Sequence, residues 1–405
     1  MKTRDVIISG GGIPGLTLAA LLGRDGFSVT VLEPATLPRP TDVKPTGRTS
    51  ALMEDSIAIL EQAGIWSKVE KTATDLRILA IIDDTSRTDF TAAEMGKPRF
   101  GANIQNALLQ SHAAAVAQKI PGVTIIQAGL HSFVAEENFV TAELSDGQIL
   151  RAPLLIGADG RNSAVRRGAG IECRSHDYEQ MAITALLTHT KPHNFTSTEF
   201  HLPGGPFTLV PMPGKTSSLV WVEHADAAEK LLRLKKKDFE QVLQDRSQGL
   251  LGELSLQTNP EAWPLKLMSA KAFTGTRIAL IAEAAHVLSP IGAQGLNLSL
   301  RDAFALYQQI SSARSYGLDH GSAAVLAKFA KERGPDTAIR VAGTHSLNQM
   351  VATDHPVLTR LRRLGFQAVS NLAPLRSLVM DQGLNPGQAS VSGRTTRAKV
   401  KTSTR

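Results

Sequence analysis

Glycines and carboxylates recur along this chain at spacings that suit a phosphate-bearing ligand, most clearly near the N-terminus. Residues 10–15 read Gly-Gly-Gly-Ile-Pro-Gly and match the pattern G-x-G-x-x-G. In it the first glycine permits a tight turn, the second lets a pyrophosphate approach the backbone, and the third allows close helix–strand contact. Glu33 follows at the distance expected of an acid that accepts from ribose hydroxyls, although a surface acid at a strand end is the simpler alternative. A carboxylate there disfavours a 2′-phosphate, so FAD or NAD is expected before NADP.

Two later stretches have related chemistry. Residues 157–163 read Gly-Ala-Asp-Gly-Arg-Asn-Ser, where Asp159 either accepts from a ribityl hydroxyl or forms an ordinary Asx turn. In residues 281–297, Pro290 and Gly292 shape a loop, and Gly295-Leu296-Asn297 begin a helix. The unpaired N–H groups of such a helix end can stabilise the negative charge that a reduced flavin gathers near N1 and its C2 carbonyl.

Each stretch lies between a predicted strand and a predicted helix. The β-branched run at 5–9, the helical spacing at 16–26 and the run at 27–32 form a βαβ unit with the motif at its turn. Strands at 154–156 and 277–281 precede the other two stretches. One nucleotide site assembled from three distant segments explains why this chemistry occurs three times.

The remaining pattern adds helices and an antiparallel region. We expect helices at 48–65, 106–119 and 227–245, a helical end from 323 to about 380, and antiparallel strands through 181–223. Short strands are expected at 123–126, 132–134 and 139–144, and within 76–90.

The composition excludes several classes of protein. The 405 residues are 42% hydrophobic and 20% charged, which is typical of a globular chain with two or three lobes. The single cysteine, Cys173, excludes an internal disulfide framework and a cysteine-based zinc site. The net charge is +7, but five cations lie in an acid-free tail, residues 388–405, so no nucleic-acid footprint is indicated. The uncharged run from Val6 to Gly23 contains four glycines within six residues, which argues against a signal or membrane helix.

Taken together, these segments resemble the class A flavoprotein monooxygenases, and specifically their ubiquinone-biosynthesis hydroxylase branch. The family's patterns G-x-G-x-x-G…E, an Arg before a helix, G-A-D-G-x-x-S-x-V-R and G-D-A-A-H-x-x-x-P-x-x-G-Q-G-x-N correspond, in this order, to four segments here. These are 10–33, 48–52, 157–166 and 282–297. The resemblance covers about residues 1–310, with further likeness at 103–106 and 205–211.

The resemblance implies an α/β fold: a Rossmann-like FAD-binding domain, similar to para-hydroxybenzoate hydroxylase, with an inserted antiparallel β substrate domain and a helical C-terminus. It places the discontinuous FAD-binding domain at 1–74, 98–176 and 272–349, and the substrate domain at 75–97 and 177–271. A helical segment, 350–387, and a basic disordered tail, 388–405, follow.

The resemblance also extends the set of site residues. Arg48 resembles an Arg that contacts the flavin, with a solvent salt bridge as the alternative; Asn106 resembles a cofactor-facing residue, with a helix N-cap as the alternative. Ala282-Glu283 departs from the usual Gly-Asp, and Ala293 interrupts the usual G-Q-G. No residue is firmly assigned to catalysis, and we expect His286 behind the flavin loop rather than acting as a base. The expected cofactor-binding residues are Gly10, Gly12, Pro14, Gly15, Glu33, Arg48, Asn106, Asp159, Glu283, Pro290, Gly292, Gly295, Leu296 and Asn297.

The implied activity is hydroxylation of the aromatic ring of a polyprenylated phenol or quinol in ubiquinone biosynthesis. FAD would be reduced by NAD(P)H and would react with O2 to give a C4a-hydroperoxyflavin. Three alternatives remain open: a hydroxylase of a small soluble aromatic, a flavin-binding subunit with little turnover of its own, and an NAD-dependent dehydrogenase. We expect no metal and no nucleic acid.

The expected location is cytoplasmic, with peripheral contact at the inner face of the membrane or docking to a biosynthetic complex, because the implied substrate resides in the bilayer. Residues 360–366 and the basic tail are the candidate contact elements; a buried helix with a loose tail is the alternative.

Overall fold

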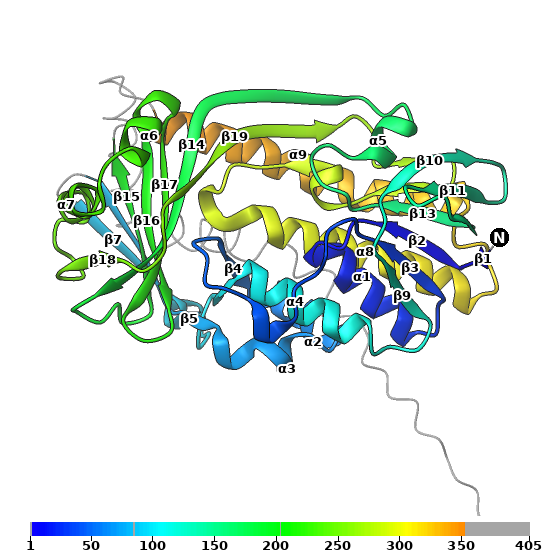
Figure 1. Cartoon of the computed structure of the whole chain (residues 1–405), viewed down its shortest axis with the longest axis horizontal. Coiled ribbons are helices and arrows are strands. Elements are labelled where there is room, and N and C mark those ends of the chain that lie inside the picture. Colours follow the sequence, from blue (N-terminus) through cyan, green and yellow to red (C-terminus); the bar gives the residue numbers. More distant parts are fainter. Residues whose placement is uncertain (1, 84–85, 203, 353–405) are drawn as a thin grey trace, which may run out of the picture.

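The computed structural model describes residues 2–83, 86–202 and 204–352. Figure 1 shows two regions at opposite ends of a long axis, joined by long elements that run between them. The predicted basic tail, and all but the first residues of the predicted segment 350–387, lie outside the described residues.

The first region is built on the N-terminal βαβ unit, which is confirmed. β2 (Val6–Ser9) and β3 (Val29–Leu32) pair in parallel, with α1 (Ile13–Arg24) between them in the chain. The six-stranded sheet has the order β20-β21-β13-β2-β3-β9, and only the edge strand β20 is antiparallel. The other strands are β9 (Val123–Ile126), β13 (Leu154–Gly157), β20 (Thr274–Gly275) and β21 (Ile278–Leu280). Because four neighbouring strands end at one edge, the loops after residues 9, 157 and 280 meet there.

Both faces of this sheet are covered. A four-stranded sheet, of order β1-β12-β11-β10, packs on one face, where Val140 and Leu150 join Ile7 and Leu155 in one core. Its strands are β1 (Lys2–Thr3), β10 (Leu130–Ala135), β11 (Val140–Leu144) and β12 (Ile149–Ala152).

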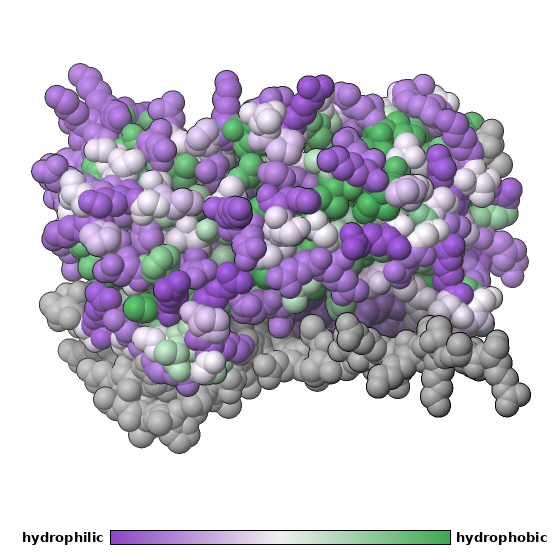
Figure 2. All heavy atoms as spheres, turned by 90° about the horizontal axis from the view of Figure 1, so that it is seen from below, coloured by the Kyte–Doolittle hydropathy of each residue, from purple (hydrophilic) through white to green (hydrophobic). Residues whose placement is uncertain are grey.

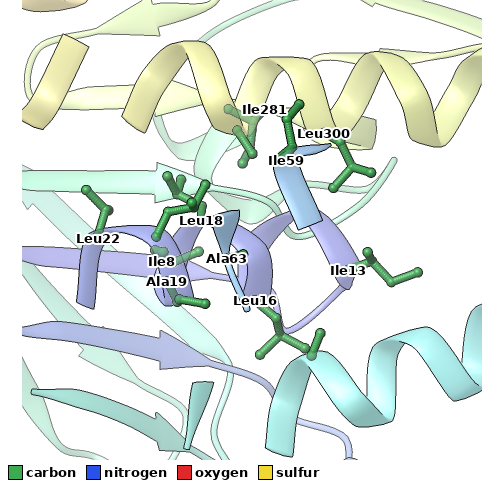
Figure 3. Packing of buried hydrophobic residues seen from close by; sticks show 14 of the residues in the cluster. Ile8, Ile13, Leu16, Leu18, Ala19, Leu22, Ile59, Ala63, Ile281 and Leu300 are labelled. Atoms are coloured by element: carbon green, nitrogen blue, oxygen red, sulfur yellow. The ribbon is translucent and has the colours of Figure 1, made fainter. Parts of the chain in front are cut away.

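On the other face lie α1, α4 (Asn106–Ala117) and α8 (Gln294–Ser315). Figure 3 shows the apolar side chains of α1 packed among their neighbours, with Leu16 directed at the helix drawn in cyan. Leu16 and Leu18 are fully buried, which fixes the helix that begins at the glycine motif.

The second region is a nine-stranded sheet. Its order is β22-β19-β14-β17-β16-β15-β6-β7, with β18 paired to β14, and its pairs are antiparallel except β15 with β6. The strands are β6 (Ile78–Asp83), β7 (Ser86–Thr91), β14 (Cys173–His189), β15 (Thr196–Leu202), β16 (Gly205–Met212), β17 (Thr216–His224), β18 (Leu254–Leu256), β19 (Glu261–Ala270) and β22 (His286–Val287).

Two helices cover the outer face of this sheet. They are α6 (Ala225–Leu232) and α7 (Lys236–Arg246), and Phe239 of α7 packs in one core with Phe207 and Trp221. The single helix predicted at 227–245 is therefore wrong: the chain turns between two shorter helices. The inner face, left uncovered by these helices, is turned toward the first region.

A three-stranded sheet, of order β4-β8-β5, lies at the junction of the two regions. Its strands are β4 (Thr49–Met53), β5 (Thr74–Leu76) and β8 (Gly101–Gln105). The helix predicted at 48–65 is wrong in its first part, because residues 49–53 pair with β8 and only α2 (Glu54–Gln62) is helical. That pairing joins residues about fifty positions apart, so local spacing does not reveal it.

The remaining helices are α3 (Trp66–Val69), α5 (Ala164–Gly168) and α9 (Ala323–Ala352). α9 packs against α8 and reaches strands β15, β16 and β19 of the large sheet, so it spans both regions (Figure 1). Among the described residues, no helix is long and apolar enough to cross a bilayer. The face drawn in Figure 2 is mostly hydrophilic, with small apolar areas between polar side chains.

Candidate cofactor and substrate site

A cavity of about 1770 Å3 lies between the two regions, and all three predicted loop segments line it. Gly12, Asp159 and Gly295, one from each segment, are among its lining residues. The volume exceeds the roughly 300–1,000 Å3 of a site for one small ligand. The cavity can therefore hold a dinucleotide together with a second molecule.

The glycine loop leaves room on the cavity side only. A Cβ on Gly10, whose φ is +113°, would lie 2.2 Å from the Ala158 carbonyl oxygen, and one on Gly15 would lie 2.3 Å from the Gly10 oxygen. A Cβ on Gly12 would meet no heavy atom closer than Cδ of Pro14, at 3.9 Å. Gly12 precedes the first turn of α1, so the open space beside it lies at a helix N-terminus, where phosphates bind well.

Glu33 directly follows β3 and lines the cavity, and its contact with a ribose stays a prediction. Its Oε2 accepts from the Gly11 amide at 2.8 Å, and its Oε1 accepts from the Ala35 amide at 3.0 Å. These bonds hold the carboxylate beside the glycine loop. Gln110 of α4 also holds this loop, since its Nε2 donates to the Gly11 oxygen at 2.8 Å. No local pattern distinguishes Gln110 within its alanine-rich helix, and the sequence interpretation missed it.

One carboxylate oxygen of Asp159 is used within the protein, and its contact with a ribityl hydroxyl stays a prediction. Oδ2 accepts from the amides of Ala164 and Val165, at 2.8 and 3.2 Å, and so ties the loop to the start of α5. Oδ1 is buried and has no partner among the described residues, although Asp159 lines the cavity.

Asn106 also lines the cavity, and its Oδ1 is likewise buried without a partner in the described part of the chain. Asn106 is the first residue of α4, and Gln105 occupies the N-cap position, so the N-cap alternative does not apply. Buried acceptors without partners are costly. Hydroxyl-bearing groups of a bound FAD would supply the missing donors, so these residues fit that cofactor.

The third segment combines a loop with the start of α8. Pro290, Gly292, Gly295 and Leu296 line the cavity. Asn297 is instead used within the protein: Oδ1 accepts from the Met53 amide at 2.9 Å, and Nδ2 donates to the Ala51 oxygen at 2.8 Å. The side chain of Asn297 therefore holds β4 against the helix start.

Both departures from the family pattern fall where a glycine is favoured. Ala282 has φ +56° and Ala293 has φ +53°, values that L-residues rarely adopt. The preference for glycine at these places thus has a backbone origin, and this chain accommodates alanine there. Glu283 lies on the cavity with its Oε2 3.7 Å from Nε of Arg161.

His286 lines the cavity but is engaged from behind. Its Nε2 lies 2.5 Å from Oδ2 of Asp302, and the other carboxylate oxygen accepts from Arg333 Nε at 2.8 Å. Burial alone would raise the pKa of Asp302, but His286 and Arg333 outweigh burial and hold that pKa below its ordinary value. These contacts join the loop after β21 to α8 and α9, and the place of His286 behind the flavin stays a prediction.

Arg48 lies on the cavity wall, with its guanidinium carbon 4.6 Å from the ring centroid of Trp263. This contact between cation and ring joins β19 of the large sheet to the segment before β4. Arg340 of α9 lines the cavity as well, and donates to Asp336 Oδ1 and to Gln294 Oε1, each at 2.8 Å. The sequence interpretation did not include Arg340.

Beyond these residues, the cavity continues along the inner face of the nine-stranded sheet. The side chains that line it there are mainly apolar, and they include Leu79, Ile81, Phe90, Val210, Val220 and Val222. The polar exceptions contributed by the strands of this wall include Ser197, Glu199, Thr208 and Glu261. Within the described residues, no cluster of side chains is suited to hold a metal ion.

Comparison with known proteins gives consistent results. The sequence model of the family described as "FAD binding domain" matches residues 3–338. The chain is 34% identical to ubiquinone hydroxylase UbiL of Rhodospirillum rubrum, over 94% of this chain and 89% of that protein. It is 30% identical to the 3-demethoxyubiquinol 3-hydroxylase of Escherichia coli, over 94% and 98% of the two chains. The crystal structure of p-nitrophenol 4-monooxygenase PnpA from Pseudomonas putida superposes with a TM-score of 0.79 at 20% identity, covering 95% and 99% of the chains, which is a likeness of fold.

Proposed function

The chain belongs to the FAD binding domain family and to its ubiquinone hydroxylases, and from that premise we propose that it hydroxylates the ring of a polyprenylated phenol or quinol. It is an FAD-dependent monooxygenase, with NAD(P)H as reductant and O2 as co-substrate. The reaction belongs to ubiquinone biosynthesis, as the names of its relatives indicate.

The apolar wall of the cavity is the observation that supports a prenylated aromatic as the substrate class. A small aromatic acid would need a cation on the substrate side. Among the described lining residues, however, the nine-stranded sheet contributes no Lys or Arg. The lining arginines, Arg48 and Arg340, contact Trp263 and Asp336 respectively. An apolar wall of this extent suits a neutral ring with a hydrocarbon tail.

The cofactor-binding residues follow from the geometry. We propose that the open face of Gly12 and the N-terminus of α1 hold the pyrophosphate, and that Glu33 binds the adenosine ribose. Asp159 and Asn106 would accept from donors of the bound cofactor, and Gly295 would stand at the flavin ring. When bound, FAD supplies the redox chemistry that activates O2 for transfer of one oxygen atom.

The residues of the chain itself position the substrate ring and enclose it in the cavity. We propose that the chain is divided into an FAD-binding domain and a substrate domain at the predicted bounds, and that the nine-stranded sheet forms the substrate domain. Its apolar wall would keep water away from the ring, and Ile339 and Leu347 of α9 add apolar side chains to the lining.

Contact with a membrane surface is the finer part of the proposal. A substrate with a prenyl tail partitions into the bilayer, so the enzyme would work at its cytoplasmic face or within a complex there. We propose that the basic tail, 388–405, contributes to this contact; these residues lie outside the described part of the chain.

The activity is tested with purified, FAD-loaded protein, a short-tail prenylated quinol, NADH or NADPH, and oxygen-18 gas. We expect NAD(P)H oxidation that depends on the quinol, and a product carrying one oxygen-18 atom. Oxidation of NAD(P)H without labelled product would contradict hydroxylation. A flavin-binding subunit without turnover would show neither result.

A further inference from the structure

A carboxylate stands in the apolar wall of the substrate side of the cavity, with a buried histidine beside it. Glu199 and His201 are two positions apart on β15, so they lie on the same face of the strand. Phe200, between them, points to the opposite face, into the core with α6 and α7. Glu199 lines the cavity, whereas the side chain of His201 is only 2% exposed.

The carboxylate of Glu199 is held by two neighbours. Its Oε1 lies 2.9 Å from Nε2 of His201, and its Oε2 accepts from the Thr208 hydroxyl at 3.4 Å. An ionised carboxylate only accepts, so the imidazole donates through Nε2. Thr208 is the residue opposite Glu199 on β16. The two contacts fix the carboxylate in the cavity wall.

The position of Glu199 is near the junction with the cofactor region. Thr208 pairs with Val220, which is two residues from Ser218, and the Ser218 hydroxyl lies 2.8 Å from that of Thr49 at the start of β4. Two residues span roughly 7 Å along a strand, and the two strand spacings from β15 to β17 add roughly 10 Å, so Glu199 lies on the order of 12 Å from Ser218. Glu199 and Thr49 line the same cavity, which a ring held between β4 and the sheet would occupy.

The side chain of Glu199 stays 24% exposed in the cavity wall although it contacts His201 and Thr208, so a ligand in the cavity can reach its carboxylate. We propose that Glu199 binds the hydroxyl group of the substrate ring and accepts its proton during hydroxylation. His201 is the positioning residue, and it acts through Glu199. This inference rests on the proposed function, since it assigns the part of the site that recognises a phenol or quinol.

The proton step balances as follows. As the ring carbon forms its bond to the transferred oxygen, it gives up an electron pair, and the O–H bond of the ring hydroxyl breaks. The proton passes to Glu199, and the electron pair of that bond forms the C=O of a cyclic dienone. The attacked carbon then loses its hydrogen as a proton to water, the ring becomes aromatic again, and Glu199 returns its proton to the ring oxygen. O2 is the oxidant and supplies the transferred oxygen atom, NAD(P)H supplies the two electrons that reduce the other oxygen atom to water, and Glu199 ends as it began.

Two variants of Glu199 separate binding from proton transfer. E199Q keeps the shape and one acceptor oxygen but takes no proton, whereas E199L removes both functions. E143Q is the matched control: Glu143 of β11 is exposed, accepts from Ser132 at 3.0 Å, and does not line the cavity. The binding probes are 2-nonylphenol and its methyl ether, followed through the absorbance of bound FAD, and turnover is measured with the short-tail quinol.

We expect wild type and E143Q to prefer the phenol over the ether by about tenfold or more, as a hydrogen bond to a charged group allows. E199L loses this preference with ether binding unchanged, and H201N reduces it. E199Q retains part of the preference, but its kcat falls by on the order of 100-fold. An E199L variant that still prefers the phenol, or an E199Q variant with wild-type kcat, would overturn the assignment.

The inference and the proposed function can fail separately. If wild type turns over no quinol but shows the Glu199-dependent preference for phenol, the hydroxyl-binding assignment stands and the proposed reaction is wrong. If wild type hydroxylates the quinol and the E199Q and E199L variants behave like E143Q, the reaction stands and the assignment is wrong. E199Q conserves volume, so the test does not depend on whether E199L folds.

Discussion

Replacing Gly12 with valine tests the assignment of the cofactor site most directly. The Cβ position of Gly12 has no close neighbour in the protein, so the valine methyl groups would occupy the space given to the pyrophosphate. Crowding of this kind weakens the free energy of FAD binding by about 1–3 kcal/mol, and loss of one hydrogen bond to a charged phosphate weakens it further by about 1.5–3 kcal/mol. At 1.4 kcal/mol per factor of ten, we expect FAD affinity to fall roughly 10²–10⁴-fold.

The same change should leave the fold almost intact. Valine is a poorer N-cap residue than glycine, which lowers the free energy of unfolding, whereas valine also restricts the unfolded chain, which raises it. Each of these two effects is about 1 kcal/mol or less, so they largely cancel. Unfolding of 405 residues has an entropy of about 0.85 kcal/mol/K, so 1 kcal/mol shifts Tm by only about 1 °C. The apoprotein of G12V should therefore melt within about 1–2 °C of the wild-type apoprotein.

The assay is an FAD titration of apoprotein, with the flavin-to-protein ratio after gel filtration as a second measure. G334V is the control, because a Cβ on Gly334 in α9 meets nothing within 4 Å and Gly334 lies outside the cavity lining. G15A is the opposite case: its Cβ would lie 2.3 Å from the Gly10 oxygen, so it should lower Tm of the apoprotein. Retention of FAD by G12V at the wild-type ratio would refute the placement of the pyrophosphate.

Three further predictions concern stability and location. D302N leaves Arg333 and His286 without their buried carboxylate and should lower the free energy of unfolding by about 3–5 kcal/mol at pH 7. Because the folded-state pKa of Asp302 is depressed, its contribution is complete above the unfolded pKa of about 3.9 and is lost as the pH falls further. Urea unfolding at pH 7 and near pH 3 should thus show the difference from D302N shrinking in acid, and a constant difference would contradict this cause. A293G relieves a φ of +53° and should raise stability by about 0.5–1 kcal/mol in the same assay; a loss would contradict the strain. Deletion of 388–405 should weaken binding to vesicles of anionic lipid, whereas unchanged binding would exclude the tail from that contact.

The three segments that meet at the cavity could be predicted from the sequence because their determinants are local. The turn at Gly10 and the start of α1 depend on neighbours within a few residues, and each loop follows its own strand. The helix predicted at 48–65 was wrong in its first part for the converse reason, since β4 exists through its pairing with residues 101–105. The spacing of apolar residues within a short segment does not indicate a partner strand that lies far away in the sequence.

The substrate side was beyond local inference for the same physical reason. Glu199 resembles any acid in an alternating strand until the sheet is assembled and its face is seen to line the cavity. Asp302 and Arg340 acquire their roles from α8 and α9 packing beside the flavin loop.

The amino-acid sequence by itself determined the βαβ unit, the glycine loop and the order of the three loops, because these follow from backbone conformations that particular residues favour. Only the tertiary structure decided which polar side chains face the shared cavity. The burial of a side chain, its hydrogen-bond partners and the pairing of its charge depend on groups that come together from distant parts of the chain.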